Sequence, residues 1–181
     1  RDLHVIAGRD ISAIASQVEA KRDVNLIATR DLNAIAAANE QHSTGNTKKV
    51  KSIEDHVQQV SSVIKAGGDA SLSAGQDLII ASAEAENGQM RKDKRHFWSS
   101  TSTTQYGSDV QVGGDLTAEA GRDLEVIASK VKAGGDVDLL AERDVMIGAA
   151  ANESSSEYRY DRGSKKKINQ ENSTVRQQMA E

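Results

Sequence analysis

The chain has 181 residues, of which 37% are hydrophobic, 3% aromatic and 28% charged, and its formal net charge is −4. It contains no cysteine, which excludes a disulfide framework and a thiolate metal site. Its apolar runs all fall short of the roughly 20 residues that a membrane-spanning helix needs, and the acidic balance argues against nucleic acid as a partner.

Ten aspartates recur at regular intervals, and each precedes a short run of alternating apolar residues. The gaps between them are 8, 13, 8, 38, 8, 38, 8, 13 and 8 residues. A unit of 21 residues therefore starts five times, and twice it is lengthened by an insertion of 25 residues. A fixed period of this size predicts stacked supersecondary units. The aspartates are Asp2, Asp10, Asp23, Asp31, Asp69, Asp77, Asp115, Asp123, Asp136 and Asp144.

Each unit predicts three short strands. In the first unit, residues 3–7, 11–15 and 18–20 alternate apolar with other side chains, which is the period of two of a half-buried strand. Three strands separated by turns make one triangular coil, and coils stacked in register rise about 4.8 Å each. The sequence therefore predicts an all-β parallel β-helix of five coils, with three short strands in each 21-residue coil.

The inward positions of the coils predict ladders of like residues. The fifth residue after the first aspartate of a unit is alanine in all five units, which suits a tight corner. We also expect Leu26, Leu72 and Leu139 to stack directly on one another inside the coil. One coil cannot bury its own inner face, so the stack must supply the stability.

The turns before the strands contain glycine and aspartate, as in Gly-Gly-Asp at 67–69, 113–115 and 134–136. The glycines are expected to supply a positive φ, and the aspartates to accept hydrogen bonds from backbone amides two residues further on. This capping role makes the ten aspartates turn residues, not paired catalytic carboxylates.

The two insertions, 39–63 and 85–109, are polar and leave the coil at the same edge of neighbouring units. They predict long projecting β-hairpins that pair with each other into one sheet, although 51–64 also has the spacing of a short helix. We therefore expect residues 1–151 to form a single solenoid with these two hairpins. Residues 152–181 are then a third projection or a fraying tail.

Basic residues lie at similar offsets in the three projections, and we expect them to stack along one side of the projecting sheet. Such a face either stays solvated and blocks edge-to-edge aggregation, or binds an anionic partner such as a phosphorylated outer-membrane glycolipid, with Phe97 and Trp98 adding a stacking surface. The candidate contact residues for an envelope component or glycan are Lys48, Lys49, Lys51, Arg91, Lys92, Lys94, Arg95, Phe97, Trp98, Lys165, Lys166 and Lys167.

Other chemistry lacks a signal in the sequence. The four histidines share no metal-ligand spacing, and Gly-Gly-Asp does not recur as the nonapeptide calcium repeat. No nucleophile motif or phosphate-cradling loop is present either. The sequence predicts no cofactor, no metal and no enzymatic activity.

The run AGRDLEVIASKVKAGGDVDLLAERDVMIGAAANE at 120–153 resembles the haemagglutinin repeats of large two-partner-secreted exoproteins of Gram-negative bacteria. The insertion at 86–115 has basic residues, then aromatic residues, then a Ser/Thr run. It is similar to the second haemagglutinin region of contact-dependent growth inhibition effectors. The resemblance implies a right-handed β-helix, export through an outer-membrane transporter of the two-partner pathway, and a secreted, cell-surface location associated with the outer membrane.

These observations predict a structural and interaction segment of a secreted surface exoprotein. The favoured interpretation is the stick of a growth inhibition effector, which contacts the target-cell outer membrane and assists toxin delivery. An adhesin segment that binds host or cell-surface glycans is the alternative. A polysaccharide-cleaving β-helix enzyme is the alternative of another class, disfavoured because the aspartates lie in regular turn ladders. Since the chain opens directly in a repeat and shows no signal peptide, we expect it to continue at both ends.

Overall fold

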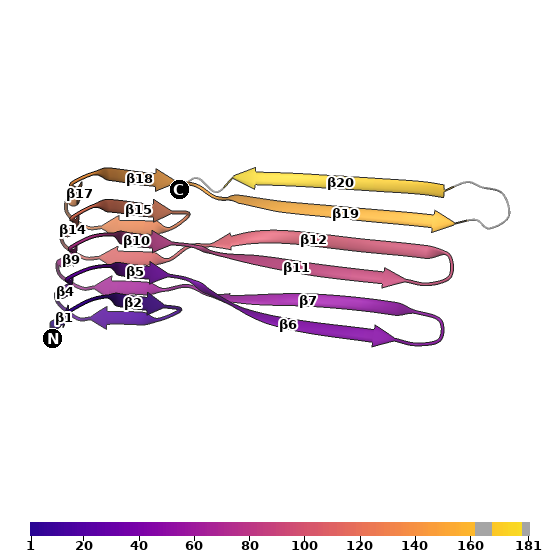
Figure 1. Ribbon diagram of the computed structural model, residues 1–181, viewed down its shortest axis with the longest axis horizontal. Helices are drawn as coiled ribbons and strands as arrows, with labels where there is room; N and C mark the ends of the chain where they lie inside the picture. The colour runs from indigo at the N-terminus through magenta and orange to yellow at the C-terminus, as the bar shows by residue number, and fades with distance from the viewer. Residues whose placement is uncertain (162–167, 179–181) are drawn as a thin grey trace.

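The computed structural model describes residues 1–161 and 168–178, with the side chains of 1–161. The described residues form three parallel sheets and one antiparallel sheet, and none of them is helical (Figure 1). The predicted all-β class is confirmed. Within 51–64 the chain forms strands and not the alternative helix.

Each 21-residue unit contributes one strand to each of two parallel sheets, and four units contribute to the third. The first sheet contains β1 (Leu3–Ala7), β4 (Val24–Ala28), β9 (Ala70–Ala74), β14 (Leu116–Ala120) and β17 (Val137–Ala141). The second contains β2 (Ile11–Ile14), β5 (Leu32–Ile35), β10 (Leu78–Ala81), β15 (Asp123–Ile127) and β18 (Asp144–Gly148). The third contains β3 (Gln17–Ala20), β8 (Val63–Ala66), β13 (Asp109–Val112) and β16 (Lys130–Ala133).

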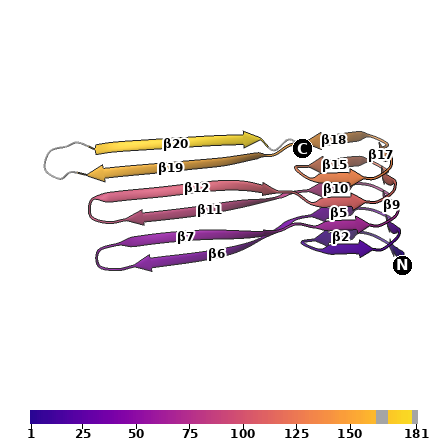
Figure 2. The ribbon, with the colours of Figure 1, turned by 180° about the vertical axis from the view of Figure 1, so that it is seen from behind.

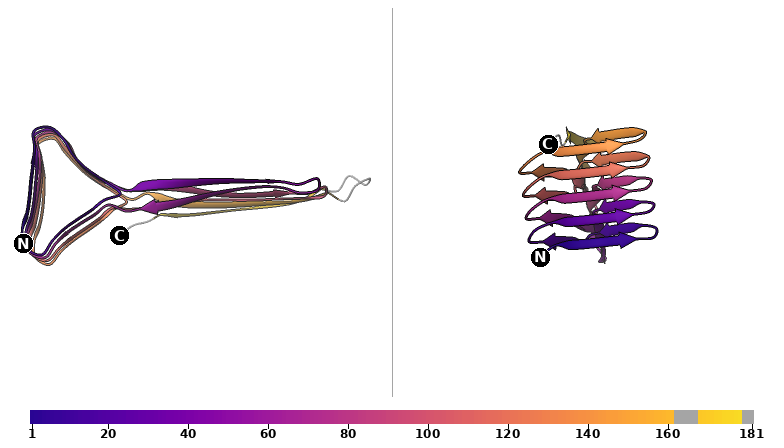
Figure 3. Two further views of the ribbon diagram at one scale, coloured as in Figure 1. Left: turned by 90° about the horizontal axis from the view of Figure 1, so that it is seen from below. Right: turned by 90° about the vertical axis from the view of Figure 1, so that its left-hand side faces the viewer.

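The three parallel sheets form the sides of a triangle when the molecule is seen along the stacking direction (Figure 3). Their inward side chains fill its interior: Leu32, Leu72 and Leu78 are 0% exposed. Because equivalent residues pair in register from coil to coil, each inward position forms a column. Inner coils cover their neighbours on both sides, whereas the first and last coils are covered on one side only.

The leucine column is interrupted by an alanine. The register runs Val5, Leu26, Leu72, Ala118, Leu139. Leu26 and Leu72 are paired neighbours, as expected. The expectation that Leu139 also stacks directly on Leu72 is wrong, because the fourth coil places Ala118 between them.

The alanine column lies at the end of the first strand in every coil. Ala28 pairs with Ala74 and Ala74 with Ala120, and these three side chains are 2–5% exposed. The column leads directly into the corner between the first and second sheets, where a larger side chain would meet the neighbouring coils.

The aspartates that open the first strand bond along the stack and not within their own turn. Asp69 Oδ1 accepts from the backbone N–H of Asp115 at 2.9 Å, and Asp115 Oδ1 accepts from that of Asp136 at 2.9 Å. The capping role is therefore present, but the donor lies in the next coil. The expectation of a donor two residues further on is wrong.

The glycines before these aspartates are required by the closeness of the coils. None of the glycines with a described environment has a φ between +20° and +160°, so the expected positive φ is wrong. Instead, a Cβ at Gly113 would overlap the carbonyl oxygen of Gly67, and a Cβ at Gly114 would overlap the Asp69 carboxylate. Glycine leaves room for the carbonyl and carboxylate to meet the backbone of the next coil.

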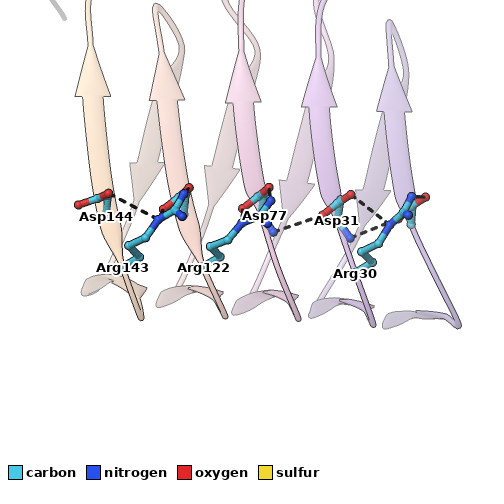
Figure 4. Close-up of polar contacts among 8 residues, drawn as sticks. Arg30, Asp31, Asp77, Arg122, Arg143 and Asp144 are labelled. Carbon is cyan, nitrogen blue, oxygen red and sulfur yellow. Dashed lines mark hydrogen bonds and ion pairs between the residues drawn. The ribbon is translucent and has the colours of Figure 1, made fainter.

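Asp10, Asp77 and Asp123, which open second strands, are clamped by arginines (Figure 4). Arg30 donates to both carboxylate oxygens of Asp10, at 2.8 and 2.6 Å. Arg122 forms the same two-pronged pair with Asp77, and Arg143 with Asp123. In each pair the arginine reaches back to the preceding coil, and its hydrogen bonds lower the pKa of Asp10 and of Asp77.

The corner after the second strand has two forms. In the first and fourth coils it is a tight turn through Ala15 (φ 46°) and Ala128 (φ 43°). In the second and third coils the chain leaves as a hairpin and returns at Ser62 and Ser108, which are 0% and 1% exposed. The Ser108 hydroxyl lies 2.8 Å from the Ala81 carbonyl oxygen and 3.0 Å from that of Ala34, so this buried group is satisfied by the stack.

The antiparallel sheet, called the hairpin sheet below, projects from this corner to one side of the coils (Figures 1 and 2). Its strand order is β20-β19-β12-β11-β7-β6. The strands are β6 (Ala37–Asn46), β7 (Lys51–Val60), β11 (Ala83–Lys92), β12 (His96–Tyr106), β19 (Ala151–Asp161) and β20 (Ile168–Gln178). Arms of 10 residues at about 3.3 Å per residue carry the turns far from the coils.

The two seams between hairpins differ because of the coils from which the hairpins start. β7 and β11 come from adjacent coils and pair over only five positions, Lys51–Asp55 with Gly88–Lys92. β12 and β19 pair over eight positions, and a coil without a hairpin lies between their coils. One hairpin is two strands wide, whereas adjacent coils are only one strand spacing apart. Hairpins on adjacent coils therefore cannot lie side by side where they leave the coils, and they pair only further out.

Candidate functional site

The distal end of the hairpin sheet gathers the predicted contact residues. The turn of the first hairpin, 47–50, and that of the second, 93–96, lie side by side at the end farthest from the coils (Figure 1). Lys48, Lys49, Lys94 and Arg95 are the exposed apex residues of these turns. Lys165, Lys166 and Lys167 lie outside the described residues.

The first turn is closed by its threonine. The Thr47 N–H donates to the Val50 carbonyl at 2.9 Å, and the Val50 N–H donates to Thr47 Oγ1 at 3.0 Å. These bonds fix the backbone on both sides of Lys48 and Lys49. The two ammonium groups are therefore presented together on a closed turn.

The second turn is closed by an aspartate. Asp93 Oδ1 accepts from the backbone N–H of Arg95 at 2.8 Å and of His96 at 2.7 Å. These two amides, followed by the His96 side chain, lower the pKa of Asp93 to about 2. The carboxylate stays ionised at neutral pH and fixes the turn that presents Lys94 and Arg95.

One face of the sheet carries a basic row next to the turns. Lys51 is paired with Lys92, Lys92 with Phe97, and Phe97 with Arg159, so these four side chains point to the same face. The Arg159 guanidinium lies over the Phe97 ring, 5.2 Å from its centroid, which is a cation–π arrangement. Lys51 and Lys92 are directly opposed like charges, and such a pair is destabilising in a sheet unless something neutralises it.

The opposite face carries an aromatic row at the same depth. Arg91 is paired with Trp98 and Trp98 with Tyr158, and successive residues of a strand point to opposite faces. Trp98 is 38% and Tyr158 39% exposed. One step closer to the turns, the His96 and Tyr160 rings stack with centroids 4.9 Å apart.

The register corrects the expected arrangement of the bases. They do not stack along one side of the sheet, because Arg91 and Lys92 point to opposite faces and the apex residues lie in the turns. They share the distal end instead. The site also includes Tyr158, Arg159 and Tyr160, which the predicted contact set omits; the aromatic-basic string YRY at 158–160 resembles the HFW string at 96–98 with which it pairs.

Clefts at the distal end are lined by these side chains. A cleft of 330 Å³ between the second and third hairpins contains Lys94, Arg95, Phe97 and Arg159. A smaller one of 220 Å³ between the first and second hairpins contains Lys48, Lys49, Lys51 and Lys92. Both are open hollows on the surface in which cations outnumber carboxylates, with Asp93 in both walls and Asp161 in the larger one.

Nearer the coils the hairpin sheet is acidic. A groove of 700 Å³ over Gly88 is lined by Glu40, Asp55, Glu84 and Glu86 among other residues. The Asp55 carboxylate and His42 Nδ1 are hydrogen-bonded there. The sheet is therefore polarised along its length, with acidic groups at mid-length and basic groups at the distal end.

Comparison with protein-family models gives a match to the hemagglutinin repeat over residues 1–55 and 88–179, most of the chain. The chain belongs to the hemagglutinin-repeat family. The resemblance of residues 120–153 is thereby confirmed at this level. Membership indicates a segment of a filamentous-haemagglutinin-like secreted exoprotein of the cell surface, in a structural and adhesive family whose general context is two-partner secretion.

The hemagglutinin-repeat match includes the distal ends of the hairpins. Its two ranges contain Lys48, Lys49, Lys51 and the whole span 91–98. None of the curated proteins matches the chain, and no solved structure does.

In residues 1–161 and 168–178 no helix is long and apolar enough to cross a membrane. The same described residues contain no group of three or more His, Asp or Glu side chains placed to hold a metal ion.

Proposed function

We propose that this hemagglutinin-repeat chain is a stick segment of a contact-dependent growth inhibition effector, and that its hairpin sheet contacts the envelope of a target cell. The coils, residues 1–151 without the insertions 39–63 and 85–109, act as a right-handed parallel β-helical spacer. The hand follows the general preference of parallel crossovers. In this role the chain assists toxin delivery and leaves its own cell through the outer-membrane transporter of the two-partner pathway.

The observation that carries this proposal is the charge of the distal end. Lys51 opposes Lys92 in one row, and the apex residues of two neighbouring turns add four more cations. Cations held this close repel one another unless a polyanion neutralises them. The phosphate-bearing glycolipid of a Gram-negative outer membrane has the matching chemistry, and Trp98 and Tyr158 suit its interface, where amphipathic aromatic rings gather.

The test is binding of the intact chain to phosphatidylcholine vesicles with and without lipopolysaccharide, measured by co-sedimentation. Changing Arg91, Lys92, Lys94 and Arg95 to Gln is expected to reduce binding at least tenfold at low salt, and added salt is expected to weaken wild-type binding. The matched control changes four coil bases, Arg1, Lys21, Lys65 and Lys132, to Gln. It removes the same charge and is expected to leave binding within about twofold.

The outcome decides between a contact and a passive spacer. Equal losses in the two quadruple variants would mean that net charge alone drives binding. Undetectable wild-type binding at low salt would remove the membrane-contact role and leave the spacer role.

The second candidate function, an adhesin segment that binds cell-surface glycans, is favoured by one observation. Trp98 and Tyr158 are neighbouring, exposed rings on one face, and such rings stack on apolar faces of other molecules. On this hypothesis Trp98→Ala abolishes binding to neutral glycans on an array, and binding changes little with salt. On the envelope hypothesis, adding Trp98→Ala to the quadruple variant weakens vesicle binding further, and this additional loss depends less on salt.

A further inference from the structure

We propose that the cleft between the turns of the first and second hairpins binds a phosphate group, and that the bound phosphate holds these two hairpins together. The ligand class is a phosphomonoester or a pyrophosphate, either free or carried by a glycolipid headgroup. The proposal rests on the envelope contact for the source of the phosphate. It adds one defined cleft, the ligand of that cleft, and a structural consequence of binding.

The walls of this cleft are rich in ammonium groups. Four lysines line the hollow of 220 Å³, and they are Lys48, Lys49, Lys51 and Lys92. Among the described residues, none of these ammonium groups has a carboxylate at ion-pair distance. Asp93 also lies in the wall, but its Oδ1 already accepts from the backbone N–H groups of Arg95 and His96. Four ammonium groups against one engaged carboxylate leave the cleft strongly cationic.

A phosphate group matches this donor set. An ammonium group has three N–H donors and no acceptor, so several of them need a ligand with several acceptors. A phosphomonoester has three acceptor oxygens and a charge of about −1.5 to −2 at pH 7. Lysine binds phosphate as a point charge, without the planar geometry that an arginine–carboxylate pair needs. At roughly 30 Å³ for each water, the hollow has room for a phosphate and a few waters.

The seam beside the cleft is short and ends in a repulsive pair. β7 and β11 pair over five positions, and the pair nearest the turns is Lys51 with Lys92. Like charges that are directly opposed destabilise a sheet. Beyond this pair, no hydrogen bond between described residues joins turn 47–50 to turn 93–96.

At its other end the same seam is reinforced by side chains. The Val57 N–H donates to Asn87 Oδ1 at 2.8 Å, and Gln59 Nε2 donates to the Ala83 carbonyl at 3.1 Å. The two hairpins are therefore joined near their roots, and the distal end of the seam is the part that a ligand can stabilise.

Binding and pairing are coupled at this point. A phosphate between the lysines replaces a repulsion between cations with attractions to a shared anion. A ligand that binds the paired seam and not the open seam stabilises the paired state by mass action. At a ligand concentration of about ten times Kd, the open fraction of the seam falls about tenfold.

The test is amide hydrogen exchange of the whole chain, measured by mass spectrometry, because exchange reports local opening. Pyrophosphate is compared with sodium chloride at equal ionic strength. We expect exchange in 51–55 and 88–92 to slow about tenfold with pyrophosphate, while exchange in the coils is unchanged. Phosphatidylcholine vesicles with intact or dephosphorylated lipopolysaccharide then distinguish the sources. Slowing by pyrophosphate shows that a free phosphate suffices, and slowing by intact lipopolysaccharide alone assigns the site to the headgroup.

The double variant Lys51→Gln/Lys92→Gln gives the sharpest test, because it removes both the repulsion and the site. Without ligand, its seam is expected to exchange more slowly than that of the wild type. With pyrophosphate, its exchange is expected to stay the same. The matched control Lys65→Gln/Lys132→Gln removes the same charge from the coils and is expected to keep the tenfold response. Unchanged exchange in the coils of both variants shows that they are folded.

Three results would overturn the proposal. They are a wild-type seam that responds to neither pyrophosphate nor lipopolysaccharide, an equal response to sodium chloride, and a full response in Lys51→Gln/Lys92→Gln. If the chain still co-sediments with lipopolysaccharide vesicles in the first case, the envelope contact stands and the phosphate site fails. If pyrophosphate slows the seam but the chain does not co-sediment, the phosphate site stands and the envelope contact fails.

Discussion

The coils and the hairpin sheet are both β-structure, but they are stabilised differently. In the coils, paired residues lie 21 or 46 positions apart, side chains of like kind stack, and the inward columns are buried. In the hairpin sheet, pairing within a hairpin is local, as for Ala37 with Val60, and long stretches of both faces are exposed. Coil positions are therefore constrained by packing, whereas hairpin positions are free to carry surface chemistry.

Charge shows the same contrast. On the coils, Arg30, Arg122 and Arg143 each meet a carboxylate of the preceding coil. At the distal end of the hairpin sheet, like charges are neighbours in the same row and in adjacent turns. The coils neutralise their charges internally, and the hairpins present theirs outward.

The largest expected effect is in the coil interior. Leu72→Asp would place an unpaired carboxylate where the side chain is 0% exposed, and we expect a loss of several kcal/mol of unfolding free energy. The control Ser71→Asp changes the adjacent, outward side chain and is expected to cost less than about 1 kcal/mol. Urea denaturation measures both. Similar Tm values for Leu72→Asp and wild type would contradict the inward position of residue 72.

The next largest effect is expected at the corner between coil and hairpin. Ser108→Ala removes the buried hydroxyl that lies against the Ala34 and Ala81 carbonyls. We expect it to cost about 0.5–1.5 kcal/mol, the net contribution of a hydrogen bond, because the Ala81 carbonyl still accepts the Ala36 N–H at 3.2 Å. Ser100→Ala, in the middle of β12, is the matched control and is expected to be near neutral. Equal Tm values for the two variants would show that the Ser108 hydroxyl does not stabilise the corner.

A smaller effect is expected when a hairpin is removed whole. Deleting 37–61 joins Ala36 to Ser62 and recreates the sequence context of the turn at Ala15 and Ser16. We expect a soluble coil whose unfolding free energy lies within about 1 kcal/mol of the wild type, because connection length affects stability only weakly. An insoluble product from this deletion would mean that the first hairpin is part of the coil's stability.

The smallest effect is confined to one turn. Two amides hold the pKa of Asp93 at about 2, below roughly 3.9 in an unfolded chain. The carboxylate's support of the turn is therefore complete above about pH 4 and is lost as the pH falls through about 2. The amide NMR shifts of Arg95 and His96 should follow this titration while the coil remains folded. Asp93→Asn should abolish it, and a midpoint near 4 in the wild type would show that the amides do not bind the carboxylate.

The repeat period of the sequence was enough to predict the coils. Each of the five units has apolar residues at every second position but cannot bury its apolar face alone, so the units stack and bury it together. The strand positions follow directly from Asp10, Asp31 and their equivalents, because each aspartate marks the start of a strand. The alanine at the end of the first strand also identifies the corner.

Contacts between coils were harder to predict, since they join residues far apart in the chain. The sequence places Gly114 beside Asp115, but only the stack brings Gly114 against the Asp69 carboxylate and makes a Cβ there impossible. For the same reason, the donor to each turn aspartate lies one coil away and not two residues away. The break in the leucine column is different, because Ala118 follows Asp115 at the same offset as Leu72 follows Asp69 and was therefore predictable from the period.

The candidate site, too, was predictable from the sequence only in part. The sequence by itself determined that bases and aromatic residues lie in polar insertions that leave one edge of the coil, because an insertion between two strands of a repeat has to project. Which of them share a face was decided by the tertiary structure. Register between hairpins depends on how many coils separate their roots, and a shift of one residue would exchange the Lys92 and Arg91 faces.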